Sequence, residues 1–302
     1  MTETAHRAGF ISIVGRPNAG KSTLLNALVG EKVAIVAPQA QTTRTTIQGV
    51  LTTAETQMVF VDTPGIHKSD TLFNKRMMET VRSALYGVDL VLFVADASKK
   101  ISQEDEHSVS ALPAGTTSIL VLNKIDRVDD KRLLLPLTEQ YMALHKFAEA
   151  VPVSARTGDG ADKLKRVIAS HLPESPALFP EDYITDQPVR FIAAELIREQ
   201  ILRATREEVP HSVAVLIDAW EDTPKLTKIA ATIYVERPGQ KSILIGSKGQ
   251  MLKKIGSEAR IQLEQRLDVK VFLSLFVKVK PNWREDPSFL SALDWRAMIG
   301  VR

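Results

Sequence analysis

The first part of the chain alternates short apolar runs with segments of helical periodicity. The apolar runs are rich in Val, Ile, Leu and Phe, and they cover residues 9–15, 57–63, 89–97, 118–124 and 150–155. This composition is typical of strands that are buried on both faces. Helix-like segments lie between them at 21–29, 73–87, 104–112, 133–147 and 160–171. The alternation predicts an α/β fold with a doubly wound, mostly parallel sheet.

The pattern changes after residue 172. Prolines recur from Pro173 to Pro188 without sustained periodicity, which predicts an ordered linker. Beyond it the apolar spacing predicts a helix at 189–207, strands at 212–220 and 226–237, a short helix near 242–245, a helix around 250–267 and a strand at 270–280. We therefore predict an α/β domain at 1–172, the linker at 173–188, an α+β domain of order α-β-β-α-α-β at 189–285 and a tail at 286–302.

Composition and charge narrow the class of protein. A chain of 302 residues that is 44% hydrophobic and 25% charged has enough length for two cores, which excludes disordered and fibrous proteins. The absence of cysteine excludes disulfides, thiolate nucleophiles and cysteine metal sites. No signal-peptide pattern opens the sequence and no window approaches eighteen consecutive apolar residues, so we expect a cytoplasmic location. The net charge is only +3, but residues 239–280 carry nine Lys/Arg against three Asp/Glu, which predicts a local site for a polyanion.

The sequence GRPNAGKS follows the first apolar run and precedes a helical segment, which is the context of a phosphate-binding P-loop. Its backbone N–H groups wrap the phosphates, Lys21 reaches the β- and γ-phosphates, and the Ser22 hydroxyl ligates Mg²⁺. The residues predicted to bind phosphate are Gly15, Arg16, Pro17, Asn18, Ala19, Gly20, Lys21, Ser22 and Thr23.

Two further motifs predict that the base is guanine. In NKID, Asp126 accepts hydrogen bonds from guanine N1–H and the 2-amino group, a donor pair that adenine lacks. The sequence SAR follows the next apolar run and resembles a loop whose Ala155 N–H contacts the guanine oxygen. The residues predicted to bind the base are Asn123, Lys124, Asp126, Ser154, Ala155 and Arg156.

The sequence DTPG, Asp62, Thr63, Pro64 and Gly65, is typical of a loop that senses the γ-phosphate. Asp62 is expected to reach Mg²⁺ through water and the Gly65 N–H to contact the γ-phosphate. The threonine-rich stretch 39–46 suits a switch segment whose hydroxyl completes the Mg²⁺ shell, from either Thr43 or Thr42, with Thr43 preferred.

Ile66 stands where Ras-like enzymes carry a glutamine that positions the attacking water, and an apolar side chain cannot orient water. Either this protein does not hydrolyse GTP or it organises the water in another way. The other motifs are intact, which favours hydrolysis. His67 follows directly and is a candidate base, although a solvated histidine is the simpler interpretation.

With GRPNAGKSTLLN, QTTR, DTPGIH, NKID and FPEDYITD the sequence resembles the TrmE–Era–EngA class of bacterial GTPases, and within it the Era family. The resemblance covers nearly the whole chain and implies that an apolar residue after DTPG is compatible with hydrolysis. In several relatives a K⁺ ion held partly by the P-loop asparagine supplies charge at the phosphates, and Asn18 matches that asparagine; the alternative is that Asn18 only favours the turn geometry. The catalytic residues expected on this basis are Lys21, Thr43, Gly65 and Asn18.

The basic segment contains Gly246-Ser247-Lys248-Gly249 between an apolar approach and a helix, as in the GxxG loop of KH modules that clamp single-stranded nucleic acid. Lys278 and Lys280 share one strand face and either line the RNA groove or form a solvated face. Trp283 either packs the tail or stacks on a base. The residues predicted to bind RNA are Ile245, Gly246, Ser247, Lys248, Gly249, Lys253, Lys254, Lys278 and Lys280.

The resemblance further implies a type II KH domain and, as RNA target, the 3′ end of small-subunit ribosomal RNA. The function expected is a monomeric GTP-hydrolysing switch that binds GTP or GDP and assists assembly of the small ribosomal subunit. One alternative is an RNA chaperone in which hydrolysis merely resets binding. Another is a membrane-peripheral signalling GTPase, since family members are reported to associate with the inner membrane and the basic segment also suits anionic lipid.

Overall fold

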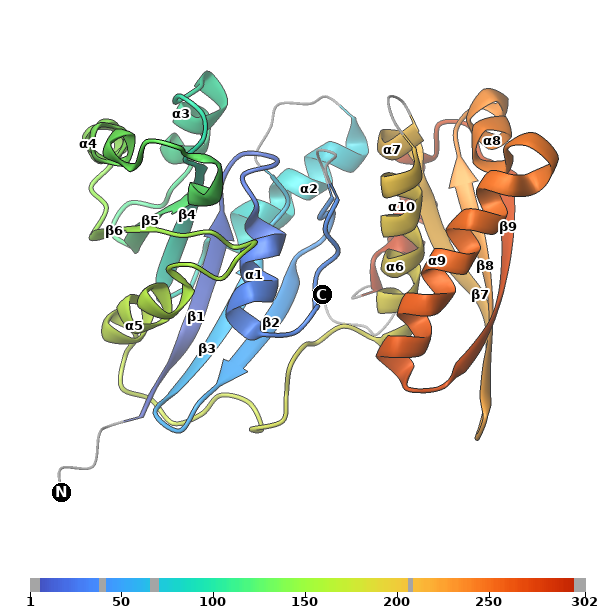
Figure 1. Cartoon of the computed structure of the whole chain (residues 1–302), viewed down its shortest axis with the longest axis horizontal. Coiled ribbons are helices and arrows are strands. Elements are labelled where there is room, and N and C mark those ends of the chain that lie inside the picture. The colour runs from blue at the N-terminus through green and yellow to red at the C-terminus, as the bar shows by residue number, and fades with distance from the viewer. Residues whose placement is uncertain (1–5, 38–41, 66–70, 206–208, 296–302) are drawn as a thin grey trace. The chain divides into compact units, whose positions relative to one another are not determined.

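The computed structural model describes residues 6–37, 42–65, 71–205 and 209–295. It divides into two compact units, and the main boundary along the chain falls between Asp186 and Gln187. Figure 1 shows an α/β unit with a large sheet and a smaller α+β unit. Among the described residues, no helix has both the length and the apolar character needed to cross a membrane.

The first unit has the alternation that the sequence predicts. Its elements are β1 (Arg7–Val14), α1 (Lys21–Val29), β2 (Ile47–Thr52), β3 (Thr56–Asp62), α2 (Leu72–Ser83), β4 (Leu90–Asp96), α3 (Gln103–Ser110), β5 (Thr117–Asn123), α4 (Leu134–Leu144), β6 (Glu149–Pro152) and α5 (Ala161–His171). The sheet order is β2-β3-β1-β4-β5-β6, and only β2 runs antiparallel to its neighbour. The P-loop, the DTPG loop, NKID and SAR therefore all follow parallel strands, at the edge of the sheet where open α/β folds bind ligands.

Two apolar cores lie on the two faces of this sheet. Alternate residues of β4 show this division, because Leu92 belongs to one core and Phe93 to the other. The first core includes buried side chains of α1 and α5, such as Leu24 and Leu164, and the second includes Val109 of α3 and Tyr141 of α4. Burial on both faces explains why the strands read as continuous apolar runs.

The proline-rich segment predicted as a linker packs on the first unit. Both backbone N–H groups of Leu178 and Phe179 donate to Gln57 Oε1, at 2.6 and 2.9 Å, and Gln57 Nε2 donates back to the Phe179 carbonyl. Phe179 also meets Phe10 edge to face. Gln57 is fully buried. Its amide supplies hydrogen-bond partners to backbone groups of Leu178 and Phe179, which belong to neither a helix nor a strand.

The second unit begins with α6 (Val189–Ala204) and continues through α7 (Val209–Ser212), β7 (Ala214–Thr223), β8 (Leu226–Val235), α8 (Pro238–Ile245), α9 (Gln250–Leu267), β9 (Lys270–Val279) and α10 (Pro287–Leu293). Its sheet has the order β7-β8-β9, with β8 antiparallel to β7 and parallel to β9. Apart from the one-turn α7, the order of elements up to β9 is the predicted α-β-β-α-α-β.

One face of the second sheet carries the helices. Ile229, Ala231 and Ile233 of β8 are buried together with Ile255 and Leu263 of α9, and α9 packs against both α6 and β9. In Figure 1, α9 runs along this sheet. The even-numbered side chains of β9 point to the other face, where Phe272 and Phe276 are more than half exposed.

Residues Pro287–Leu293 form the short helix α10, whose packing settles the role of Trp283. The indole is fully buried, its Nε1 donates to the Ser212 carbonyl at 2.9 Å, and its ring meets Phe289 of α10 edge to face. Trp283 is therefore a packing residue and does not present its face to a base.

Candidate functional site

The P-loop between β1 and α1 adopts backbone conformations that its glycines permit. Gly15 has φ +146°, and a Cβ there would lie 2.3 Å from the Val94 carbonyl oxygen. Gly20 has φ +98°, and a Cβ there would lie 2.4 Å from Asn123 Nδ2. Larger residues at either position would displace neighbouring strands or the NKID motif. The loop is thus built against β4 and β5 as well as its own strand.

Lys21 projects its ammonium into this loop. Its Nζ donates to the carbonyls of Gly15 at 3.0 Å and Arg16 at 3.2 Å, and the side chain is buried. The pKa of Lys21 is lowered to about 8, chiefly by burial, while Asp62 opposes the shift and the nearby Arg16 adds to it. An anionic ligand stabilises such a desolvated ammonium, because its negative charge offsets the hydration that the ammonium loses on burial.

Ser22, Thr43 and Asp62 converge from three separate parts of the first unit. Ser22 Oγ donates to Asp62 Oδ2 at 2.7 Å, Thr43 Oγ1 donates to the same oxygen at 3.0 Å, and the two hydroxyls lie 2.7 Å apart. Thr43 is buried, whereas the Thr42 hydroxyl donates to the Ala37 carbonyl instead. Of the two threonines that the sequence left open, the structure places Thr43 in the site.

This cluster has the donors that Mg²⁺ requires. All are hard oxygens, and the second carboxylate oxygen, Asp62 Oδ1, is buried with no hydrogen-bond partner. Burial raises the pKa of Asp62, against the opposing effect of Lys21 and the two hydroxyls. A divalent cation would offset this cost. Within the described ranges no group of three or more His, Cys, Asp or Glu side chains suits a metal ion, so hydroxyls and phosphate oxygens would complete the shell.

Asn123 joins the P-loop to the SAR loop. Its Nδ2 donates to the Ala19 carbonyl at 3.0 Å, and its Oδ1 accepts from the backbone N–H of Ala155 at 3.0 Å. Both ends of the Asn123 amide are thus engaged by backbone, so this side chain holds the SAR loop against the P-loop.

Asp126 is held as an ionised acceptor. Ser154 Oγ donates to Asp126 Oδ1 at 2.6 Å, and Arg156 lies 2.7 Å from Oδ2. The Ser154 hydrogen bond is the main cause of the lowered pKa of Asp126, and Arg156 adds to it against burial. Arg156 is largely exposed, so it can yield Oδ2 to the donors of a guanine ring.

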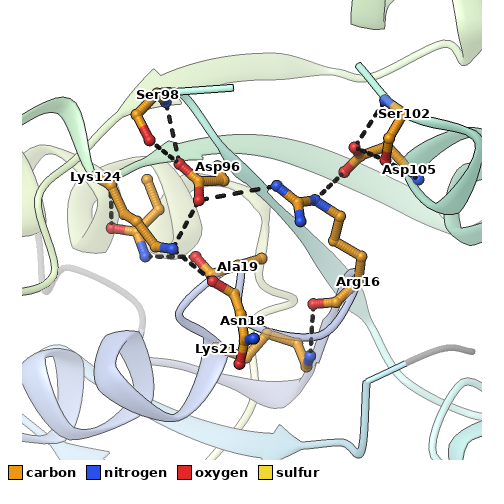
Figure 2. Close-up of polar contacts among 10 residues, drawn as sticks. Arg16, Asn18, Ala19, Lys21, Asp96, Ser98, Ser102, Asp105 and Lys124 are labelled. Carbon is orange, nitrogen blue, oxygen red and sulfur yellow. Dashed lines mark hydrogen bonds and ion pairs between the residues drawn. The ribbon is translucent and has the colours of Figure 1, made fainter. Parts of the chain in front are cut away.

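Lys124 ties the NKID motif to the P-loop through a residue that sequence reasoning missed. Its Nζ lies 2.7 Å from Asp96 Oδ2 and 2.5 Å from the Asn18 carbonyl oxygen, as Figure 2 shows. Burial opposes ionisation of Asp96, but bonds from Lys124 and Ser98 outweigh it and lower the pKa. Asp96 ends β4, and its position at the end of a parallel strand was the available signal.

The DTPG loop lies directly on the P-loop. Thr63 Oγ1 donates to the Ile13 carbonyl at 2.8 Å, and a Cβ on Gly65 would lie 2.8–2.9 Å from three atoms of Pro17. The Gly65 backbone is thus beside the phosphate-binding backbone, as its predicted role requires. Pro64 is buried next to it. Ile66 and His67 lie outside the described residues.

In the second unit, the GxxG loop joins α8 to α9 with three residues at positive φ, Gly246 (70°), Lys248 (50°) and Gly249 (77°). A Cβ on Gly246 would meet Met251 at 2.7 Å. No side chain caps α9 at Gly249, so its first-turn N–H groups face the loop, where a helix N-terminus favours phosphate. Ser247, Lys248, Lys253 and Lys254 are exposed around it, while Ile245 is half-buried.

Lys278 and Lys280 do not gather with this loop. Leu275 packs under Gly256 of α9, so the even-numbered residues of β9 face away from the helices that carry GxxG. Lys280 lies beyond the end of β9, pairs with Asp286 at 2.8 Å and sits over the Phe289 ring. Of the two alternatives for these lysines, the structure favours the solvated face, and sequence could not choose because period-2 alternation fixes a face but not which face carries the helices.

Comparison with known proteins covers both units. A family model described as 50S ribosome-binding GTPase matches residues 10–124, and one described as KH domain matches residues 208–284. GTPase Era of Geobacter metallireducens is 47% identical over 298 residues, which is 98% of this chain and 100% of that protein. GTPase Era of Trichlorobacter lovleyi is 46% identical over 98% of this chain and 100% of that protein.

Two solved structures are similar along nearly the whole chain. One is an Aquifex aeolicus Era variant bound to GDP·AlF4⁻, with a TM-score of 0.92. The other is Era in complex with MgGDPNP and nucleotides 1506–1542 of 16S ribosomal RNA, with a TM-score of 0.93. Each is 41% identical to this chain and covers 96% of it and 99% of the solved chain. These likenesses confirm the predicted P-loop GTPase fold followed by a KH domain.

Proposed function

The chain belongs to the Era family of GTPases, and we propose that it is a switch that binds the 3′ region of small-subunit ribosomal RNA through its KH domain and assists assembly of that subunit. It is a GTP hydrolase, as its full-length relatives and its GTPase domain establish. The related Era that was solved with 16S ribosomal RNA nucleotides supports the choice of RNA.

Several residues of the first unit take part in GTP hydrolysis, each in a different role. Water attacks the γ-phosphorus, the bond to the β–γ bridging oxygen breaks, and GDP and phosphate leave. Lys21 and the P-loop N–H groups stabilise the negative charge that develops on the phosphate oxygens, and the Gly65 N–H contacts the γ-phosphate. Ser22, Thr43 and, through water, Asp62 would hold Mg²⁺, which neutralises charge on the β- and γ-oxygens. Asp126 selects guanine.

The observation that carries the RNA half of the proposal is the Gly246–Gly249 loop. Positive φ angles at both glycines turn the backbone sharply, and the N-terminus of α9, which no side chain caps, opens at this turn. Lys248, Lys253 and Lys254 place exposed positive charge there. A backbone that approaches closely, a helix N-terminus and flanking lysines are what the sugar-phosphate chain of single-stranded RNA requires.

Charge reversal at this loop tests the RNA site. Lys248→Glu is expected to weaken binding of an oligonucleotide that matches the 3′ end of small-subunit rRNA by about tenfold to a hundredfold, because one phosphate contact becomes a repulsion. Fluorescence anisotropy of the labelled oligonucleotide, with GDP and with a non-hydrolysable GTP analogue, measures the affinity. Lys270→Glu is the matched control, since Lys270 is also an exposed lysine but lies at the start of β9, past the end of α9 that is opposite the GxxG loop.

Equal loss in both variants would mean that only net charge matters and would overturn the loop assignment. Binding to vesicles that contain anionic lipid is measured alongside binding to the oligonucleotide. If they bind more tightly than the oligonucleotide and respond in the same way to Lys248→Glu, the basic segment serves a membrane and the RNA proposal is wrong. Stronger RNA binding with the GTP analogue than with GDP would identify the GTP-bound form as the RNA-binding state.

We also propose that K⁺ at Asn18 supplies the charge that a glutamine or arginine supplies elsewhere. Asn18 has φ 60°, a left-handed conformation that asparagine tolerates well, so a change to alanine would disturb the turn and any ion together. Asn18→Gly keeps the turn and removes the amide. Its hydrolysis rate in Na⁺ is expected to match that of the parent protein, while a stimulation by K⁺ of about tenfold is lost. An unchanged ratio of rates in K⁺ and Na⁺ would exclude Asn18 as a ligand.

The cytoplasmic location, the monomeric state and the peripheral membrane association stay predictions from the sequence.

A further inference from the structure

Arg16 occupies a variable position of the P-loop motif, yet its side chain is almost fully buried. Figure 2 shows its guanidinium between two carboxylates on neighbouring elements. Arg16 Nε lies 3.0 Å from Asp105 Oδ1 at the start of α3, and Arg16 Nη2 lies 3.8 Å from Asp96 Oδ2 at the end of β4. The side chain thus extends from the loop toward the sheet and α3. The backbone carbonyl of Arg16 accepts a hydrogen bond from the Lys21 ammonium.

Asp105 is a fixed partner for this guanidinium. It is 1% exposed, and its Oδ2 accepts from Ser102 Oγ at 2.6 Å and from the Ser102 backbone N–H at 3.0 Å. The two residues form the capping box of α3, which fixes the side chain as well as the helix start. Tyr141, from α4, lies near enough for the Asp105 carboxylate to add to the rise in the pKa of the phenol that burial causes. The capping box at the start of α3 therefore holds the carboxylate in place.

Asp96 links this pair to the other side of the loop. The oxygen that faces Arg16 also pairs with Lys124 Nζ, and Lys124 in turn binds the Asn18 carbonyl. The loop is thus anchored at two points, at Arg16 through its own side chain and at Asn18 through Lys124. Both cations contact Asp96 Oδ2. Gly15 and Asn18 have positive φ, and a loop of such conformations keeps a single shape only when its surroundings fix it.

We propose that Arg16 is a positioning residue for nucleotide binding, and that Asp105 acts through it to hold the phosphate-binding backbone in its binding shape. The Asp105–Arg16 pair would then contribute to affinity without touching the nucleotide, as groups around a binding site commonly do. The inference rests on the proposed nucleotide site, because the backbone that Arg16 holds is the one assigned to the phosphates.

A double-mutant cycle tests whether Asp105 works through Arg16. Asp105→Asn removes the nearer of the two carboxylates from the buried guanidinium and is expected to raise the Kd for GDP about tenfold, or ~1.4 kcal/mol. Arg16→Gln is expected to do the same. The double variant should bind no more weakly than Arg16→Gln alone, because the second change removes nothing further. Binding and release of a fluorescent GDP analogue by the full chain give Kd and the dissociation rate, and thermal unfolding shows that each variant is folded.

The controls separate positioning from general loss of stability. Glu236→Gln makes the same change opposite another arginine, Arg284, whose two bonds to it are 3.1 and 2.5 Å, in the second unit. It should lower Tm and leave Kd unchanged. Arg16→Lys keeps the charge but cannot fork to two carboxylates, so a Kd between those of the parent and Arg16→Gln is expected, and this variant decides the matter if Asp105→Asn does not fold.

Two results would overturn the proposal. One is that Asp105→Asn, or Arg16→Lys in its place, binds GDP as the parent protein does. The other is that the effects of Asp105→Asn and Arg16→Gln multiply in the double variant, which would make Asp105 act independently. Lys21→Ala distinguishes these from failure of the nucleotide site itself, since unchanged GDP binding in that variant would mean that the phosphates bind elsewhere.

Discussion

Replacing Asp126 by asparagine is expected to weaken GDP binding by about a hundredfold or more and to create binding of xanthosine diphosphate. Ser154 Oγ donates to Asp126 Oδ1, and an asparagine oxygen can keep that bond. The Nδ2 group then occupies the position of Oδ2, where it opposes the 2-amino group of guanine. Xanthine carries an oxygen at that position and accepts the bond instead. Sites that hydrogen bond their ligand reject a mismatched analogue by large factors, because buried polar groups are left unpaired.

Competition of GDP and xanthosine diphosphate against a fluorescent nucleotide measures both effects in one assay. Asp129→Asn is the matched control, since Asp129 is an exposed aspartate close by in the sequence and should alter neither affinity. If Asp126→Asn retains GDP affinity, or loses it without gaining affinity for xanthosine diphosphate, Asp126 does not read the base edge. Weaker GDP binding together with a lower Tm in the absence of nucleotide would instead indicate a damaged fold.

The strands and the nucleotide motifs could be predicted from sequence because burial and chemistry leave local signals. All seven residues of β4 are buried, and six of them are apolar, as burial on both faces requires. The seventh, Asp96, is ion-paired with Lys124. Helix α1 has the bounds expected from the motif and the apolar spacing, since Gly20 and Gly30 end it on both sides in left-handed conformations.

Strand β2 could not be predicted from its own residues, because its composition reflects how other parts of the chain pack against it. Its Gly49 lies against Leu25, Val29 and Val33, where a Cβ would approach within 3.0–3.2 Å. Close packing of α1 over the strand therefore selects a residue of low strand propensity. The preference for Thr43 over Thr42 could not be established from sequence either, since only the three-dimensional path of the chain decides which hydroxyl reaches Asp62.

The role of Arg16 also had no sequence signal. The P-loop pattern specifies glycines, lysine and serine and leaves this position open, and Asp105 belongs to a different strand–helix unit of the sheet. The capping box of Ser102 and Asp105 indicates only where a helix starts. Long-range ion pairs become visible only when the sheet order places α3 beside the loop, so the residues that position a site are harder to predict than those that contact its ligand.

Gly65→Ala is expected to lower kcat for GTP hydrolysis by about a hundredfold to a thousandfold while GDP affinity changes by less than about twofold. The φ of Gly65 lies outside the left-handed region, so alanine can adopt the backbone conformation and the effect is steric. The added Cβ would lie 2.8 Å from Pro17 Cγ and 2.9 Å from its Cα and N. Backbone cannot yield as a flexible side chain would, so the DTPG loop must move away and its N–H no longer meets the γ-phosphate. Loss of one such donor typically costs this factor in rate.

Selectivity for the triphosphate state distinguishes this effect from general damage. GDP lacks the γ-phosphate, so its Kd should be nearly unchanged in Gly65→Ala, whereas affinity for a non-hydrolysable GTP analogue should fall. Gly239→Ala is the matched control, because a Cβ there meets no atom within 4 Å, and it should leave kcat and both affinities as they are. Hydrolysis at the parental rate in Gly65→Ala would contradict the placement of the DTPG loop on the P-loop. Equal weakening of GDP and of the analogue would show that Gly65 supports the P-loop itself and has no part in sensing the γ-phosphate.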